Sequence, residues 1–123
     1  LDNSQETELE NKIINKNLKF DLIIEDAGHY YKDQIISLFT LFQTLKKNGI
    51  FVIEELDFPN LREDMNPDKK RPTLKDILTL VKNNKDFNSE LITKSQKKYF
   101  LENISLIEIF KGEFNEVAFL KKK

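Results

Sequence analysis

Cysteine is absent from the chain, so neither a disulfide framework nor a thiolate metal site can form. No apolar run approaches the roughly 20 residues that a membrane-spanning helix requires. Basic and acidic side chains number 20 and 21, so no one-sided charge favours nucleic acid or an anionic membrane surface. These absences predict a cytoplasmic protein whose partners include neither nucleic acid nor a membrane.

Glycine is scarce, and Gly28, Gly49 and Gly112 lie far apart in the sequence. Loops that cradle phosphate groups need closely spaced glycines, so both the P-loop and the dinucleotide-binding fingerprint are missing. No serine stands in a nucleophile-elbow context, which removes the usual basis for covalent hydrolase chemistry. The chain starts at Leu1 rather than methionine and has no signal-peptide pattern. We therefore expect it to be a piece of a longer protein.

The first half of the sequence predicts a βαβ unit. Residues 20–24, apart from Asp21, and residues 50–53 have consecutive rather than alternating apolar side chains, which is typical of strands covered on both faces in a parallel sheet. Between them, residues 32–47 show helical spacing. The apolar positions there recur at intervals of three and four: Ile35, Leu38, Phe39, Phe42 and Leu45. Asn48-Gly49 then favours a left-handed stop to the helix.

The second half predicts a loop, a helix and a hairpin. Residues 57–72 hold all 3 prolines and form a loop longer than a connection needs. Thr73, with Asp76 three residues later, is a candidate N-cap for a helix that ends near Asn83-Asn84. Strands at 104–110 and 117–120 are joined by a short polar segment containing glycine, which indicates an antiparallel hairpin.

Residues 87–103 are ambiguous between a strand at Leu91-Ile92 and a polar helix at 94–102. The order of elements is therefore β-α-β-α-β-β. We expect one α/β domain spanning residues 1–123, with parallel strands and a C-terminal antiparallel hairpin at one edge of the sheet.

Acidic residues follow both predicted parallel strands. Glu25 and Asp26 end the first strand, and Glu54 and Glu55 end the second. Ligands of open α/β sheets bind outside the carboxyl ends of the strands, so these carboxylates are expected to converge there. A cation would relieve their repulsion, and an all-oxygen site favours magnesium, calcium or manganese over zinc. His29, beside them, could act as a general base.

Other interpretations of the same residues stay open. Acids at strand ends are often ordinary turn residues, and a single loop histidine is more often merely exposed. Tyr30 and Tyr31 could stack on a substrate ring, although aromatic residues at helix starts more commonly just pack. Only the whole set of acids with the histidine indicates a site.

The same residues resemble a methyltransferase family that modifies sugars on macrolide antibiotics. Residues 20–29, FDLIIEDAGH, are similar to the family's F-D-x-I-I-D-D-G-S-H, and residues 48–56, NGIFVIEEL, resemble its G-G-x-Y-V-I-E-D-L. Residues 34–45 resemble the helix between these motifs, and residues 1–4 resemble the end of its G-D-Q-S segment. The similarity covers nearly the whole chain but only the later half of the family's domain.

The resemblance implies a partial Rossmann-like methyltransferase sheet and a set of roles. Asp26, Glu54 and Glu55 would hold Mg²⁺, His29 would be the general base, and Asp2 would lie near the adenine of S-adenosylmethionine. The acceptor would be a hydroxyl of a sugar or a related small molecule. Departures such as Glu25 and Glu55 in place of aspartates keep the charge but move it about one bond farther out.

The resemblance also implies that the chain alone is inactive, because the glycine-rich turn that grips the cofactor belongs to the missing half. The competing hypothesis is a small non-catalytic α/β module for binding or self-assembly. In either case the strand at 20–24 would have an unpaired edge, which predicts a homo-oligomer. A metal-dependent nuclease or phosphatase shares the acids but would need a lysine or second histidine nearby.

Overall fold

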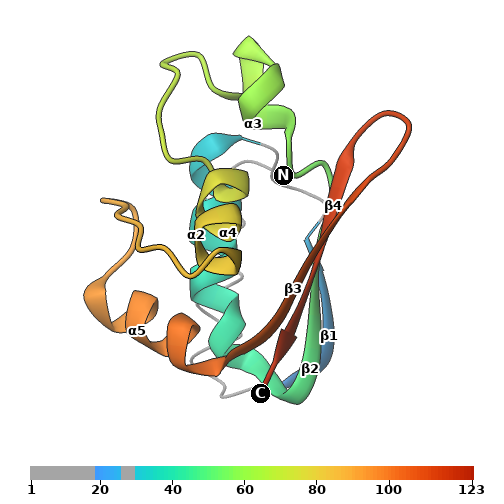
Figure 1. The fold of residues 1–123 in the computed structure, drawn as a ribbon, viewed down its shortest axis with the longest axis vertical. Coiled ribbons are helices and arrows are strands. Elements are labelled where there is room, and N and C mark those ends of the chain that lie inside the picture. Colours follow the sequence, from blue (N-terminus) through green and yellow to red (C-terminus); the bar gives the residue numbers. More distant parts are fainter. Residues whose placement is uncertain (1–18, 26–29) are drawn as a thin grey trace.

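The computed structural model describes residues 19–25 and 30–123 (Figure 1). In chain order the elements are β1 (Phe20–Glu25), α2 (Tyr31–Leu41), the 3-10 turn η1 (Phe42–Thr44), β2 (Leu45–Ile53), α3 (Phe58–Leu61), the 3-10 turn η2 (Glu63–Met65), α4 (Leu74–Lys82), α5 (Lys94–Asn103), β3 (Ile104–Lys111) and β4 (Glu116–Lys122).

Within the described part of the chain, four strands form one sheet in the order β1-β2-β4-β3. β1 and β2 are parallel neighbours, which confirms the βαβ unit, and β3 and β4 form the expected antiparallel hairpin. In the hairpin turn the Gly112 N–H donates to the Asn115 carbonyl oxygen at 2.7 Å. β4 pairs antiparallel with β2 and joins the hairpin to the parallel pair. The mixed α/β fold class is therefore confirmed.

The core lies between the sheet and the helices α2, α4 and α5, which all pack on one side of it (Figure 1). One row of paired strand residues runs across the sheet on that side: Ile23, Phe51, Leu120 and Ile107. All four belong to the hydrophobic core or pack against it. In α2, Ile35 and Leu38 are fully buried, as the helical spacing predicts.

The predicted helix at 32–47 is too long, because α2 ends at Leu41 and β2 begins at Leu45. Leu45 continues the helical spacing, so periodicity alone could not exclude it from the helix. Its side chain is only 1% exposed, and it pairs with Phe20 of β1. Asn48 is left-handed as expected, with φ 66°, but it lies within β2 rather than at the helix end.

Two capping boxes start the later helices. Thr73 and Asp76 begin α4 as predicted, with each side chain bonded to the other residue's backbone N–H. Thr93 and Gln96 make the same arrangement at α5. This second box decides the ambiguous segment in favour of a helix, because it satisfies backbone groups that a helix start would otherwise leave unpaired. None of the described helices is long and apolar enough to cross a membrane.

Candidate functional site

The two parallel strands end at the same edge of the sheet. Glu25 pairs with Ile53 in the parallel register, and the Glu54 N–H donates to the Glu25 carbonyl oxygen at 3.2 Å. Glu25, Glu54 and Glu55 therefore lie together at the carboxyl ends of the strands, where an open α/β sheet binds ligands. The other predicted site residues, Asp2, Asp26 and His29, lie outside the described residues, so their roles stay predictions.

The backbone at this edge is constrained by a side chain from α2. Glu55 has φ 54°, in the left-handed region that non-glycine residues seldom adopt. Gln34 is only 1% exposed, and its Nε2 donates to the Glu55 carbonyl oxygen at 3.0 Å. Such backbone strain costs about 1–3 kcal/mol and concentrates at functional sites. Gln34 is thus a positioning residue for this edge that the sequence pattern did not reveal.

The donor chemistry at this edge can be compared with that of a magnesium site. Glu25 is 8% exposed, and Glu54 and Glu55 are half-buried, so three carboxylates stand at one edge. Carboxylate oxygens are the ligands that Mg²⁺ prefers, so the donor chemistry fits. Within residues 19–25 and 30–123, however, no three acids or histidines converge closely enough to hold a metal ion. The predicted ligand set of Asp26, Glu54 and Glu55 therefore depends on Asp26.

Asp57, two residues after Glu55, has a structural role. The residue is 7% exposed, and its carboxylate accepts a hydrogen bond from the Glu116 N–H at 3.0 Å. The Leu56 N–H donates to the Glu116 carbonyl oxygen at 2.9 Å, and Glu116 also pairs with Lys75 at 2.8 Å. These contacts fix the exit of β2 against β4 and α4. Their partners are far apart in sequence, so no local motif could have indicated them.

A cation stands close to the acidic edge. Arg62 pairs with Asp64 at 2.7 Å and lies over the Phe58 ring, 5.1 Å from its centroid. The hydrogen bond and charge of Asp64 raise the pKa of the Arg62 guanidinium, and the charge of Glu55 adds to the rise. The loop after β2 therefore brings a positive group toward the carboxylates.

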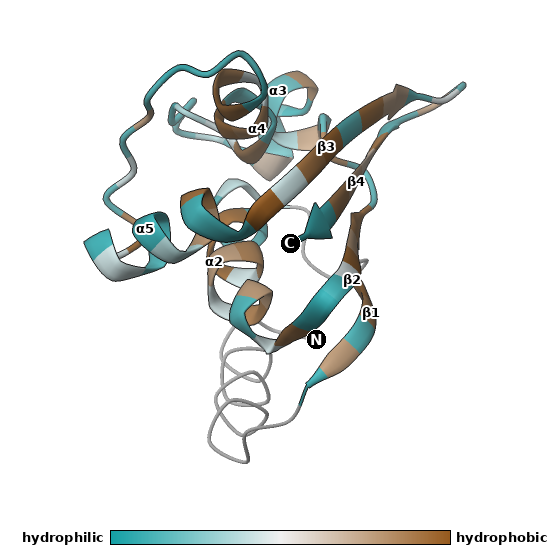
Figure 2. Cartoon of the chain, turned by 60° about the horizontal axis from the view of Figure 1, so that its bottom comes forward, coloured by the Kyte–Doolittle hydropathy of each residue, from teal (hydrophilic) through white to brown (hydrophobic). Residues whose placement is uncertain are grey.

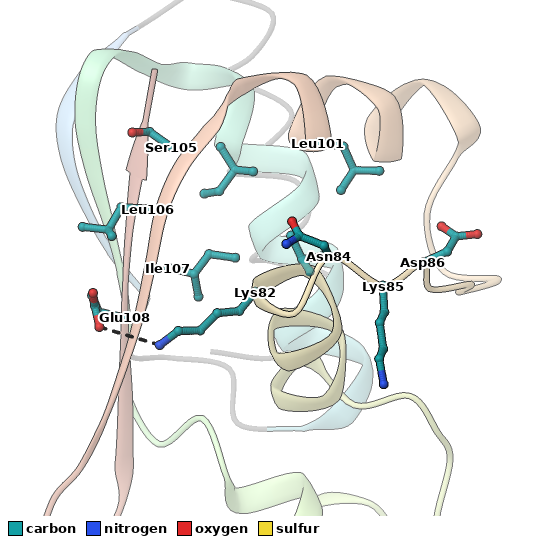
Figure 3. A pocket seen from close by; sticks show the side chains of 11 residues that line it. Lys82, Asn84, Lys85, Asp86, Leu101, Ser105, Leu106, Ile107 and Glu108 are labelled. Carbon is teal, nitrogen blue, oxygen red and sulfur yellow. Dashed lines mark ion pairs between the residues drawn. The ribbon is translucent and has the colours of Figure 1, made fainter.

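A pocket of about 630 Å³ lies away from the acidic edge, against the edge strand β3 and the ends of α4 and α5 (Figure 3). Lys82 and Glu108 face each other across it and form an ion pair at 3.7 Å. Glu108 pairs with Phe119 of β4, which in turn pairs with Val52 of β2. This pocket is thus two strands away from β2, and its size alone does not connect it with the acidic edge.

Comparisons with known proteins give matches only at the level of structure. No protein-family model matches the chain, and no curated protein matches it in sequence. The fold is similar to the structure of MycE methyltransferase from the mycinamycin biosynthetic pathway in complex with Mg, SAH and mycinamycin VI. That match has a TM-score of 0.67 and 22% sequence identity, and it covers 94% of this chain and 28% of that chain.

A second structure of MycE, crystal form 2 with Mg and SAH, matches with a TM-score of 0.67 and 20% identity. It covers 94% of this chain and 29% of that chain. At this level of identity the likeness shows the fold, which is that of part of a methyltransferase sheet. The chain spans less than a third of the length of these proteins.

Proposed function

We propose that this chain forms the acceptor-side part of an S-adenosylmethionine-dependent O-methyltransferase that acts in the cytoplasm on a hydroxyl of a sugar or related small molecule. The observation that carries the proposal is the gathering of Glu25, Glu54 and Glu55 at the carboxyl edge of two parallel strands, in a fold shared with a methyltransferase. Both MycE structures named above contain Mg and SAH, which agrees with the cofactors implied by the sequence.

Each residue has a role in this proposal. Glu54 and Glu55, together with Asp26, would hold Mg²⁺. When bound, this ion would act as a Lewis acid that lowers the pKa of an acceptor hydroxyl. His29 accepts the proton of that hydroxyl, since an imidazole titrates near neutral pH. Gln34 holds the Glu55 backbone through its hydrogen bond at 3.0 Å and so orients the acidic edge.

We assign most of the residues that bind the methyl donor to a part of the protein outside this chain. The chain spans 28% of the MycE chain, and it lacks a glycine-rich phosphate-type loop. Asp2 is the one residue that we assign to S-adenosylmethionine, near its adenine. The chain alone is therefore expected to be inactive, with activity belonging to a longer protein or an assembly that completes the sheet beyond β1.

Calorimetry tests the proposal directly. S-adenosylmethionine and MgCl₂ are titrated into this chain and into a version extended upstream along its reading frame. We expect the cofactor to bind the extended version alone, and Glu54→Gln with Glu55→Gln to abolish Mg²⁺ binding there. Glu63→Gln, which changes an exposed acid of η2, is the matched control and leaves Mg²⁺ binding unchanged. Absence of cofactor binding in both versions contradicts the proposal.

A second candidate function is a non-catalytic module that assembles with further copies of itself. It is favoured by the edge strand β1, where Leu22 is 53% exposed and Ile24 is 57% exposed. Among the described strands only β2 pairs with β1, so its outer backbone groups can accept another strand. A second copy of the chain is the proposed partner at this edge.

A further inference from the structure

A pocket of about 330 Å³ lies between the start of α2 and the loop that follows Glu55. Tyr30 and Tyr31 line it from the helix start, and Met65 and Pro67 line it from the loop. In Figure 1 these two segments lie at the same end of the molecule. The volume is within the range of small-molecule sites, about 300–1,000 Å³, and such sites have mainly apolar and aromatic walls.

The loop side of the pocket is held in place by one buried amide. Asn66 is 6% exposed, and its Nδ2 donates to the carbonyl oxygens of Pro59 at 3.3 Å and Lys70 at 2.9 Å. Its Oδ1 accepts the Lys70 N–H at 3.0 Å. These three bonds close the loop around Asn66, so the wall formed by Met65 and Pro67 exists before any ligand binds.

The charges around the pocket favour a neutral ligand. Two lysines and two carboxylates line it: Lys32, Lys70, Asp68 and Glu90. The charges of these four side chains sum to zero, so the pocket has no net attraction for a phosphate or a cation. Hydroxyl groups of a ligand can donate hydrogen bonds to the carboxylates and accept them from the lysines. Burial, and then the charge of Glu90, raise the pKa of Tyr31, which keeps its phenol a neutral donor. Tyr30 is 51% exposed and offers an aromatic ring to a ligand.

A single residue, Gln34, links the pocket to the acidic edge through its backbone and its side chain. The Gln34 N–H donates to the Tyr30 carbonyl oxygen at 3.2 Å, and the Gln34 side chain donates to the Glu55 carbonyl oxygen at 3.0 Å. Tyr30 also follows the predicted general base, His29, directly in the sequence. Two hydrogen bonds through Gln34 therefore connect the pocket wall at Tyr30 with the edge at which a hydroxyl would react.

We propose that this pocket binds the sugar ring of the acceptor, with Tyr30 as the platform for its C–H face and the Met65–Lys70 loop as the element that selects the ring. The proposal rests on the proposed function for the identity of the reaction, but sugar binding here requires neither metal nor methyl donor. The structure thus assigns acceptor choice to two segments of this chain.

Tyrosine fluorescence can report on the pocket because the chain has 3 tyrosines and no tryptophan. In a Tyr99→Phe background, only the two pocket tyrosines emit. Neutral methyl glycosides of several hexoses are titrated, with cyclohexanol and glucose 6-phosphate as comparison ligands. We expect saturable changes with at least one glycoside at millimolar concentration and none with the phosphate. Tyr30→Ala should weaken binding about tenfold or more, while Tyr30→Phe keeps it, because the ring is the platform.

Phe114→Ala is the matched control, since Phe114 is an aromatic residue that is 86% exposed and does not line the pocket. Its affinity for the glycoside should equal that of the background. No saturable response to any glycoside, equal binding of cyclohexanol, or loss of affinity in Phe114→Ala as large as in Tyr30→Ala overturns the proposal. Glycoside binding without cofactor binding in the extended version contradicts methyl transfer and leaves the sugar pocket standing. Cofactor binding in the extended version without any glycoside response contradicts the sugar pocket and leaves methyl transfer standing.

Discussion

The two faces of the sheet carry similar residues but have different surroundings. On the helix side, the row Ile23, Phe51, Leu120 and Ile107 is packed into the core. On the other side, the strands present the residues next in sequence, and five of their apolar side chains are exposed: Leu22, Ile24, Leu106, Phe110 and Phe119. Figure 2 shows hydrophobic segments along β2 and β3, although all three long described helices lie on one side of the sheet.

The two faces therefore differ in how far the described residues cover them. Parallel strands are normally covered on both faces, and the consecutive apolar residues Leu22, Ile23 and Ile24 of β1 predict that arrangement. The described residues cover one face only. The open face and the free edge of β1 are therefore the surfaces through which we expect the chain to meet a second copy or the rest of a longer protein.

The largest expected effect is on the free energy of unfolding, and it concerns a phenylalanine in the core on the helix side of the sheet. Phe100 is fully buried, and its ring lies 4.9 Å from that of Phe39 and 4.8 Å from that of Phe42. Phe100→Ala should lower the free energy of unfolding by about 3–5 kcal/mol, because it leaves a cavity among packed rings. Urea unfolding followed by circular dichroism measures the loss.

The matched control for Phe100 is a phenylalanine of the open face. Phe110 is 55% exposed and contacts Phe119 edge to face, with 5.6 Å between ring centroids. Phe110→Ala should cost about 1 kcal/mol or less. Equal losses in the two variants would mean that the open face is packed as tightly as the core.

The next effect concerns association. We expect the chain to self-associate through β1, and Leu22→Lys with Ile24→Lys to raise the dissociation constant about tenfold or more. Lysine on an edge strand keeps its charge in water, which opposes the pairing of another strand. Sedimentation equilibrium measures the change, and denaturant unfolding checks that the variant remains folded.

Leu61→Lys serves as the control for association, because Leu61 is 73% exposed on α3 and lies outside the sheet. It should leave the dissociation constant unchanged. If the unaltered chain sediments as a monomer at tens of micromolar, self-association through the β1 edge is wrong, and completion by a longer protein remains as the account of the open face.

Sequence patterns were most informative where structure depends on neighbours in the chain. The capping box of Thr73 and Asp76 and the hairpin turn at Gly112 are local, so they could be predicted. The end of α2 could not, because Leu45 fits the helical spacing while its burial against the sheet decides its place in β2. Tertiary pairing of this kind overrides helical periodicity.

The candidate site divides in the same way. Acids at both strand ends were visible in the sequence, and the parallel register brings Glu25 and Glu54 to one edge. The bond from Gln34 to Glu55 and the loop closed by Asn66 depend on contacts between separate elements. No spacing rule reveals such contacts, so the positioning residues and the pocket emerged only from the fold.

The smallest expected effect distinguishes two helices that cover the same face. Burial tends to raise the pKa of Asp76 at the start of α4, but hydrogen bonds from Thr73 and Arg71 outweigh burial and lower it. A carboxyl with a lowered pKa in the folded chain stabilises it above the unfolded value, about 3.9, and this contribution is lost as the pH falls through the folded value. Gln96, at the same position in the α5 capping box, has no proton to gain.

Asp76→Asn should therefore cost about 1 kcal/mol at neutral pH, and its difference from the unaltered chain should shrink toward pH 3. Gln96→Ala should cost a similar or smaller amount that does not change with pH. Urea unfolding of the three proteins at both pH values measures these differences. A cost of Asp76→Asn that is the same at pH 7 and pH 3 would show that the charge of Asp76 does not stabilise the start of α4. The cap would then stabilise this helix by hydrogen-bond geometry alone, as the glutamine cap of α5 does.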